Sequence, residues 1–297
     1  MSEPRCRWTL VVDRVRGVEA RGNAIAGCER GTSALPAHSA TVAAYLRHLE
    51  GTGRCVSAVS RALASISEGH KAAGHESPRS SVVVRKTLQA IRRRVGVAPR
   101  QKMPVLADDL RRMVSALGSG LQGLRDRALL LVGFAGAFRR SELVSLDVRD
   151  VAFTQEGLEI ILRRSTTDQE GEGRKVGIPY GSTAKACPVR ALRAWLEAAE
   201  ITKGRVFRSV SRDGKIGAAA SDRAVARAVK RAASLAGLDS AQYSGHSLRA
   251  GLATAAAKAG KSERAIMRQT GHRSVAMVRR YIRDADLFND NAAAGLL

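Results

Sequence analysis

The segment His246-Ser247-Leu248-Arg249 has side chains and a spacing suited to work on a phosphate group. In a helix, His246 and Arg249 project from the same face, because residues three apart are neighbours on the helix surface. An arginine holds a phosphate as a bidentate fork, and a histidine adds a single hydrogen bond or carries a proton. A His-x-x-Arg pattern is weak on its own, so its interpretation depends on the residues around it.

Two further places in the sequence carry polar residues that need an explanation. Arg139 follows an apolar stretch at 128–138, so its charge either reaches solvent or is engaged by a partner. Glu142 is placed to pair with Arg139 across one helical turn, and for these two residues alone a local ion pair is the ordinary explanation. Tyr281 lies nine residues after His272. A core tyrosine is the ordinary explanation there, but its neighbours are basic: Arg279, Arg280 and Arg283.

The charge of the whole chain indicates a polyanionic partner. The 297 residues include 50 Lys and Arg against 27 Asp and Glu, a net charge of +23. Residues 1–102 carry 18 basic and 7 acidic side chains and residues 103–297 carry 32 and 20, which excludes a lone basic tail. No apolar run approaches the roughly 18 residues of a membrane span, and residues 1–35 do not resemble a signal peptide. The four scattered cysteines indicate neither disulfides nor a metal site, so we expect a reduced, cytoplasmic protein with no membrane partner.

The elements that must position these residues are mostly helices. Aromatic residues are only 4% of the chain, and apolar residues recur at helical spacing in three stretches before residue 96. These stripes are Val42, Tyr45, Leu46 and Leu49; then Val56, Val59, Leu63 and Ile66; then Val84, Leu88, Ile91 and Val95. The third helix sets a cationic face opposite its stripe: Arg85, Lys86, Arg92 and Arg93. A solvated face is the ordinary explanation, but the charge of the chain favours DNA binding.

The chain divides at a linker over 96–104, which holds two prolines and no apolar period. We assign no structure to 1–35, a helical domain to 36–95 and a second domain to 105–297. In the second domain we expect helices after Asp108 and over 128–138, 188–199, 221–236, 248–259 and 262–269, and one more that carries Tyr281. Short strands over 148–153, 158–162 and 175–179 predict a small antiparallel sheet. The fold class is mainly α with a small antiparallel β-sheet.

Four motifs in this order resemble those of the tyrosine recombinases, also called the phage integrase family. They are Gly136 to Leu143 with Arg139, His246 to Arg249, Thr270 to Ser274 with His272, and Tyr281. The resemblance spans roughly residues 38–290. It implies a helical core-binding domain and a mixed α/β catalytic domain, which together form a C-shaped clamp around double-stranded DNA.

The resemblance also implies an activity and an assembly. It implies a site-specific DNA recombinase that cleaves and rejoins double-stranded DNA through a 3′-phosphotyrosyl intermediate, with no metal, ATP or other cofactor. The expected DNA carries inverted-repeat arms, bound by a dimer at each site and a tetramer in synapsis. The end of the chain, 286–297, would dock onto a neighbouring protomer.

The resemblance further implies the role of each site residue. Tyr281 would be the nucleophile, and Arg139 and Arg249 would neutralise the charge that gathers on the phosphate oxygens. His272 would add a hydrogen bond to the phosphate, and His246 would assist proton transfer. Glu142 would brace Arg139.

One expected residue is missing. The family places a lysine before the last strand of the sheet as general acid for the departing oxygen, and Thr166 stands at that position. A threonine hydroxyl is a far weaker acid than an ammonium group. Three explanations stay open: Lys175 is the general acid, Arg164 stabilises the leaving group, or the chain cleaves poorly. The rival functions are a cleavage-impaired, sequence-specific DNA-binding protein of the same fold and a type IB-like topoisomerase.

Overall fold

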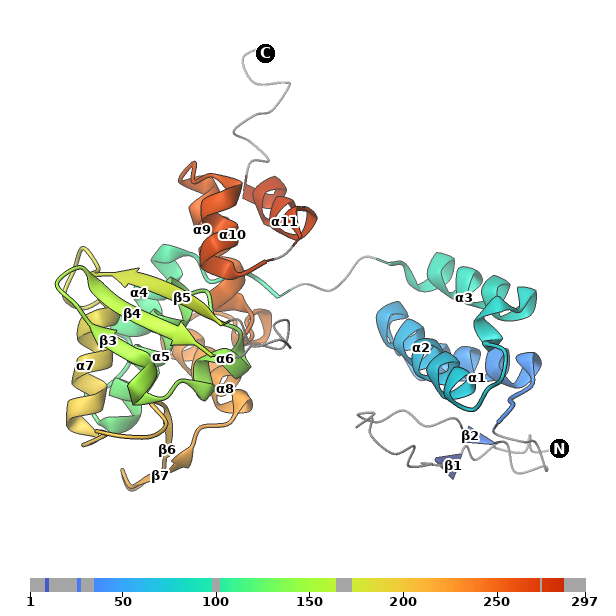
Figure 1. The fold of residues 1–297 in the computed structure, drawn as a ribbon, viewed down its shortest axis with the longest axis horizontal. Coiled ribbons are helices and arrows are strands. Elements are labelled where there is room, and N and C mark those ends of the chain that lie inside the picture. Colours follow the sequence, from blue (N-terminus) through green and yellow to red (C-terminus); the bar gives the residue numbers. More distant parts are fainter. Residues whose placement is uncertain are drawn as a thin grey trace, which may run out of the picture. The chain divides into compact units, whose positions relative to one another are not determined.

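The chain folds into two compact units, residues 1–100 and 101–297 (Figure 1). The computed structural model describes residues 9–10, 26–27, 35–97, 102–163, 173–272 and 274–285. The described residues are mainly helical with small antiparallel sheets, which confirms the predicted fold class. The division between residues 100 and 101 falls inside the stretch 96–104 that we predict to be a linker.

The described residues of the first unit include three α-helices. They are α1 (Ser39–Gly51), α2 (Val56–Ala72) and α3 (Val82–Val95), with a short 3-10 helix, η1 (Pro78–Ser80), before the last. Their apolar stripes meet in one core that includes Leu46, Leu63 and Leu88. Val95 was wrongly predicted in this core: it is 45% exposed, because it closes the last turn of α3. Two short strands, β1 (Thr9–Leu10) and β2 (Ala26–Gly27), pair antiparallel.

The second unit combines eight described helices with two antiparallel sheets. The helices are α4 (Ala107–Ser115), α5 (Leu121–Ala135), α6 (Arg140–Ser145), α7 (Pro188–Ala198), α8 (Asp222–Leu235), α9 (Ser247–Lys258), α10 (Glu263–Thr270) and α11 (Val275–Ala285). The predicted helix over 128–138 ends earlier, at Ala135, because Ala137 takes a positive φ of 49° and turns the chain. Helix α6 was not predicted.

The main sheet has the strand order β3-β4-β5, with β3 (Val151–Phe153), β4 (Gly157–Leu162) and β5 (Arg174–Pro179). The strand predicted from residue 148 begins later, because Val148–Asp150 forms a 3-10 helix, η2. Side chains alternate along β5, so Arg174 lies on the same face as the buried Val176, whereas Lys175 lies on the outer face. A second hairpin, β6 (Arg208–Val210) with β7 (Ile216–Ala219), was also not predicted.

The helices of the second unit pack closely enough to fix α9 in place. Helix α5 is buried along most of its length, and Trp195 of α7 is fully buried, with its indole N–H donating to the carbonyl oxygen of Val206 at 2.9 Å. A side chain at Gly251 of α9 would lie 1.9 Å from the carbonyl oxygen of Val105. The backbone of α9 therefore rests directly on the segment that precedes α4.

Helices α9, α10 and α11 share a small apolar cluster of their own. It comprises Ala253, Ala257, Ile266 and Val278, and Met267 and Tyr281 pack against it. Arg279 of α11 also pairs with Glu263 at the start of α10, with Nε 2.9 Å from Oε1. These contacts hold α11 against α9 (Figure 1). No helix in the described ranges has the length and apolar character needed to cross a membrane.

Candidate active site

The turn between α5 and α6 positions the first arginine. Arg139 is the N-cap residue of α6, and its backbone N–H donates to Oε2 of Glu142 at 2.9 Å. Its Nη1 donates to Oε1 of the same carboxylate at 2.5 Å. Glu142 is only 2% exposed, so this ion pair is shielded from water on the carboxylate side. The pair expected across one helical turn is therefore present, and it fixes the orientation of Arg139.

Arg249, in the first turn of α9, is the most deeply buried cation of the site. It is 1% exposed, and its Nη1 donates to the carbonyl oxygen of Ala137 at 2.7 Å. Its Nη2 is buried, and no atom of the described residues forms a hydrogen bond with it. Burial, and then the charge of Arg139, lower the pKa of Arg249 to about 10, while the charge of Glu142 opposes this shift. The group still carries its charge at neutral pH, next to the other arginine.

Tyr281 of α11 and His246, the N-cap residue of α9, meet at the same place. The hydroxyl oxygen of Tyr281 lies 3.2 Å from Nε2 of His246. Partial desolvation lowers the pKa of His246 below 6.5, and the charges of Arg249, Arg140 and Arg139 lower it further. The imidazole is therefore neutral at neutral pH and can take a proton from the tyrosine.

His272 follows the C-terminus of α10 and is buried. Its Nδ1 lies 2.7 Å from the hydroxyl oxygen of Thr270, and its ring centroid lies 5.9 Å from that of Tyr281. Burial, and then the charges of Arg249 and Arg139, lower the pKa of His272 to about 4. His272 is therefore neutral, and its imidazole carries a single ring proton.

The structure adds Arg174, which we did not predict. Its Nη1 donates to the carbonyl oxygen of Gln269 at 2.8 Å, at the C-terminal end of α10, and its Nη2 lies 3.5 Å from Oε2 of Glu142. Burial lowers the pKa of Arg174, although the nearby charge of Glu142 opposes that shift. The strand alternation could have indicated an inward side chain at 174, but its partner lies 95 residues away in the sequence.

The structure therefore brings six of the predicted residues together: Arg139, Glu142, His246, Arg249, His272 and Tyr281. Lys175 is placed differently. Its Nζ pairs with Oε2 of Glu159 at 2.5 Å on the outer face of the sheet, where its side chain is 63% exposed. Arg164 and Thr166 lie outside the described residues.

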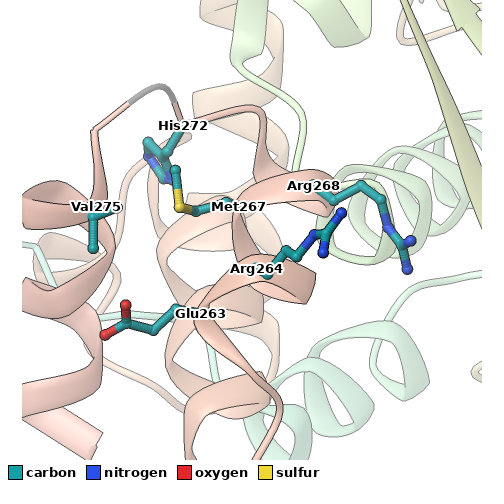
Figure 2. Close-up of a pocket in the computed structure, with 6 residues that line it drawn as sticks. All are labelled: Glu263, Arg264, Met267, Arg268, His272 and Val275. Carbon is teal, nitrogen blue, oxygen red and sulfur yellow. The ribbon is translucent and has the colours of Figure 1, made fainter.

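A pocket of about 620 Å³ adjoins His272 (Figure 2). Helix α10 contributes Glu263, Arg264, Met267 and Arg268 to its lining, and Val275 of α11 and His272 itself complete it. Among the side chains that the structure describes, no group of three or more His, Cys, Asp or Glu residues is arranged to hold a metal ion.

Comparisons with known proteins show the family of the chain. The family model described as phage integrase family matches residues 105–287. The integrase/recombinase xerD homolog of Selenomonas ruminantium is 42% identical over 267 residues, which cover 88% of this chain and 78% of that protein. The chain belongs to the phage integrase family of tyrosine recombinases, enzymes that cleave and rejoin DNA. This confirms the resemblance seen in the sequence motifs.

Solved structures show the same fold. The XerH site-specific recombinase, in a post-cleavage complex with a palindromic difH substrate, superposes with a TM-score of 0.65 at 17% identity, covering 87% of this chain and 72% of that chain. A lambda integrase dimer bound to a COC' core site gives a TM-score of 0.57 at 18% identity, covering 89% of this chain and 68% of that chain.

Proposed function

We propose that this chain is a site-specific DNA recombinase that works through a 3′-phosphotyrosyl intermediate. The observation that carries the proposal is the 3.2 Å separation between Tyr281 Oη and His246 Nε2. His246, being neutral, accepts the hydroxyl proton as the tyrosine oxygen attacks the phosphorus. The bond from phosphorus to the 5′ oxygen breaks, and that oxygen leaves with a proton from a general acid. Rejoining reverses each step, so neither ATP nor a metal is consumed.

The charges around Tyr281 support phosphate as the reacting group. Three guanidinium groups, those of Arg139, Arg174 and Arg249, interact electrostatically with the carboxylate of Glu142. A cluster with this excess of positive charge is unfavourable in a buried site unless an anion joins it. In the transition state, Arg139 and Arg249 stabilise the charge on the non-bridging oxygens. Glu142 orients Arg139, and His272 donates a hydrogen bond to the phosphate.

The general acid remains assigned to Lys175, with Arg164 and slow cleavage as the alternatives. For Lys175 to reach the leaving oxygen, the β4–β5 hairpin must shift, because the side chain lies on the outer face of the sheet, and its ammonium group must leave Glu159. An exposed pair of this kind contributes little free energy, about 0–1 kcal/mol, so breaking the ion pair itself costs little.

The proposed partner is double-stranded DNA with inverted-repeat arms. On α3, the predicted basic face is exposed: Arg85, Lys86, Arg92 and Arg93. A shallow pocket of about 470 Å³ lies on this helix and is lined by Lys86 and Arg93. We propose that this face contacts the DNA backbone from the first unit while the second unit holds the scissile phosphate. The xerD homolog is described as an integrase/recombinase, and the XerH substrate as palindromic, in line with this partner.

The proposed assembly is a dimer at each site and a tetramer in synapsis, with 286–297 docking onto a neighbouring protomer. Those residues lie outside the described part of the chain, and they include apolar Leu287, Phe288, Leu296 and Leu297. The pocket beside His272 is a candidate acceptor, because Met267 and Val275 supply apolar walls. A chain truncated at Asp284 is expected to bind one arm normally and to lose cooperative assembly on two arms.

The experiment that tests the proposal uses a DNA duplex nicked near the scissile phosphate, which traps the covalent intermediate. The wild-type chain is expected to form a covalent protein–DNA adduct, and Tyr281→Phe to form none. Tyr180→Phe is a matched control, because Tyr180 is an exposed tyrosine next to β5. No adduct from the wild-type chain would indicate a DNA-binding protein without cleavage. An adduct with relaxation of supercoils, but no strand exchange between two sites, would indicate a topoisomerase.

A further inference from the structure

The side chain of Gln269 joins three elements of the second unit. Gln269 lies in the last turn of α10, and its Nε2 donates to the carbonyl oxygen of Ala135 at 2.7 Å and to that of Gly177 at 3.2 Å. Ala135 ends α5 and Gly177 lies on β5. An amide nitrogen has two N–H groups to donate, one for each of these carbonyls. Gln269 therefore ties the end of α10 both to the end of α5 and to the sheet.

Arg174 makes the reverse connection, from β5 to α10. Its Nη1 donates to the carbonyl oxygen of Gln269 at 2.8 Å, and the carbonyl oxygen of Arg268 lies 3.4 Å away. Carbonyl groups in the last turn of a helix have no partner within the helix, and a positive charge there is favoured by the helix dipole. Gln269 thus accepts from β5 through its backbone and donates to β5 through its side chain. We call Arg174 and Gln269 the clamp.

The clamp holds the turn that leads to His272. Gly271, the C-cap residue of α10, has a φ of +66°, a conformation that residues with a side chain rarely adopt. A side chain at Gly271 would lie 2.9 Å from Cζ and 3.0 Å from Nε of Arg174, so the guanidinium packs directly against the backbone of the turn. His272 is the next residue and is only 7% exposed. The clamp therefore sets the end of α10, and the end of α10 sets the imidazole.

The contacts of the clamp are directed into the protein. Nη2 of Arg174 is buried, and the hydrogen bonds described above engage its Nη1 and the amide of Gln269 with backbone carbonyls. Arg174 has a second route to the site, because its Nη2 lies 3.5 Å from Oε2 of Glu142, which orients Arg139. Gln269 forms no hydrogen bond with Glu142 or Arg139 among the described residues. A change at Gln269 therefore tests the route through His272 alone.

We propose that Arg174 and Gln269 are positioning residues that fix His272 for cleavage by tying the end of α10 to β5 and α5. The proposal rests on the proposed function, because it takes the scissile phosphate as the group on which His272 acts. Because α5 ends just before the turn that carries Arg139, the clamp also fixes His272 relative to that arginine. A misplacement of a reacting or stabilising group by about 1 Å can slow a reaction by about 10²-fold.

The test removes the side-chain half of the clamp. Gln269→Met keeps the length of the side chain, loses both N–H donors and leaves Glu142 untouched. At saturating protein, single-turnover cleavage of the nicked duplex is expected to slow by about 10–100-fold, with unchanged affinity for the DNA. Arg174→Gln should slow cleavage as well. Arg174→Lys, which keeps a charged donor for the carbonyl oxygen of Gln269, should recover part of that loss.

The matched control is Arg208→Gln. Arg208 lies on β6 and also donates to a backbone carbonyl, that of Lys203 at 2.7 Å, so its loss should leave the cleavage rate at the wild-type value. In a His272→Ala background, Gln269→Met is expected to cause no further loss, because the clamp acts through the imidazole. An equal loss in both backgrounds would overturn the proposal, as would weaker DNA binding with an unchanged rate at saturation.

The imidazole signal of His272 gives a readout that does not depend on cleavage. In the DNA-free chain, its Cε1–H resonance, assigned by its loss in His272→Gln, is expected to shift in Gln269→Met and to stay in place in Arg208→Gln. The resonance of His70, a buried histidine of the first unit, should move in neither variant. An unmoved His272 resonance in Gln269→Met would contradict the proposal. If the wild-type chain did not cleave at all, the proposed function would fail, while this resonance would still show whether the clamp holds His272.

Discussion

The hydroxyl oxygen of Tyr281 lies 3.2 Å from Nε2 of His246, although 35 residues separate the two in the sequence. The contact crosses from α11 to the start of α9, and the apolar cluster shared by α9, α10 and α11 holds the two helices together. Nucleophile and base therefore meet within one chain, and no DNA is required to bring them together. The chemistry of cleavage should accordingly depend on the protonation state of His246.

The first prediction concerns pH. The pKa of His246 is lowered from its usual 6.5, so the neutral, proton-accepting form is present above that lowered pKa and is lost as the pH falls through it. The rate of single-turnover cleavage should therefore be level near neutral pH and should fall on the acid side. Arg140→Gln removes one of the charges that lower this pKa, so the acid limb of the profile should move to higher pH.

The matched control for this profile is Arg223→Gln. Arg223 is an exposed arginine of α8 that is not among the charges acting on His246. Its pH profile should coincide with that of the wild-type chain. An acid limb that stayed in place in Arg140→Gln, or a rate that rose as the pH fell, would rule out His246 as the base.

The second prediction concerns the general acid. If Lys175 protonates the leaving oxygen, Lys175→Ala should slow cleavage of ordinary DNA by about 10²–10⁴-fold. A substrate with sulfur in place of that 5′ oxygen should be cleaved at nearly the same rate by the variant and the wild-type chain, because a thiolate leaves without a proton. In the Lys175→Ala variant, Thr166→Lys, which supplies an ammonium group where the family has one, should restore cleavage of the oxygen substrate and leave the sulfur substrate unchanged.

The control for this experiment is Lys203→Ala, which removes an exposed lysine from another loop. Equal slowing of the oxygen and sulfur substrates by Lys175→Ala would mean that Lys175 binds DNA rather than donating a proton. An unchanged rate with both substrates would remove Lys175 from the mechanism and leave Arg164 or slow, unassisted departure.

The third prediction concerns stability. Glu142 is the buried carboxylate that balances Arg139 and Arg174, so Glu142→Gln leaves an uncompensated positive cluster. We expect the free energy of unfolding of the second unit to fall by about 3–5 kcal/mol, as for other broken buried ion pairs. Glu263→Gln breaks the exposed pair with Arg279 instead and should cost about 0–1 kcal/mol. Urea denaturation measures both.

Added sulfate provides a second test of Glu142→Gln, because a sulfate ion bound next to Arg139 and Arg174 would replace the lost negative charge. Added sulfate should restore more stability to Glu142→Gln than to Glu263→Gln at equal ionic strength. If both variants lost the same free energy, or if sulfate acted equally on both, the cluster would not be the electrostatic unit described above.

Features that depend on residues close together in the sequence were predicted, whereas contacts between residues far apart in the sequence were not. The helices of the first unit were predictable because each apolar stripe marks the face that is buried, as Leu46, Leu63 and Leu88 show. The hairpin β6–β7 and helix α6 are too short to leave a periodic pattern. The motifs indicated Arg139, Arg249 and Tyr281 through their order, but no spacing could indicate Arg174, whose partners on α10 are distant in the sequence.

The fourth prediction concerns how the first unit binds DNA. A protein that neutralises phosphates releases counterions, so the logarithm of the binding constant should fall linearly with the logarithm of the salt concentration. Each phosphate contact contributes a slope of about 0.9 on double-stranded DNA, so Arg92→Gln and Arg93→Gln should each flatten the line by about that amount. Arg61→Gln, on an exposed position of α2 outside the basic face, should leave the slope unchanged.

Sequence dependence then distinguishes backbone contacts from base contacts on α3. Loss of a phosphate contact weakens binding to all sequences alike, whereas loss of a base contact weakens binding to the preferred site more than to others. Because Arg92 and Arg93 lie in the last turn of α3, where the helix dipole favours basic side chains but does not direct them into a groove, we expect the uniform loss. A selective loss would mean that this helix reads base edges, and a flat salt dependence of the wild-type chain would contradict DNA binding through the basic face.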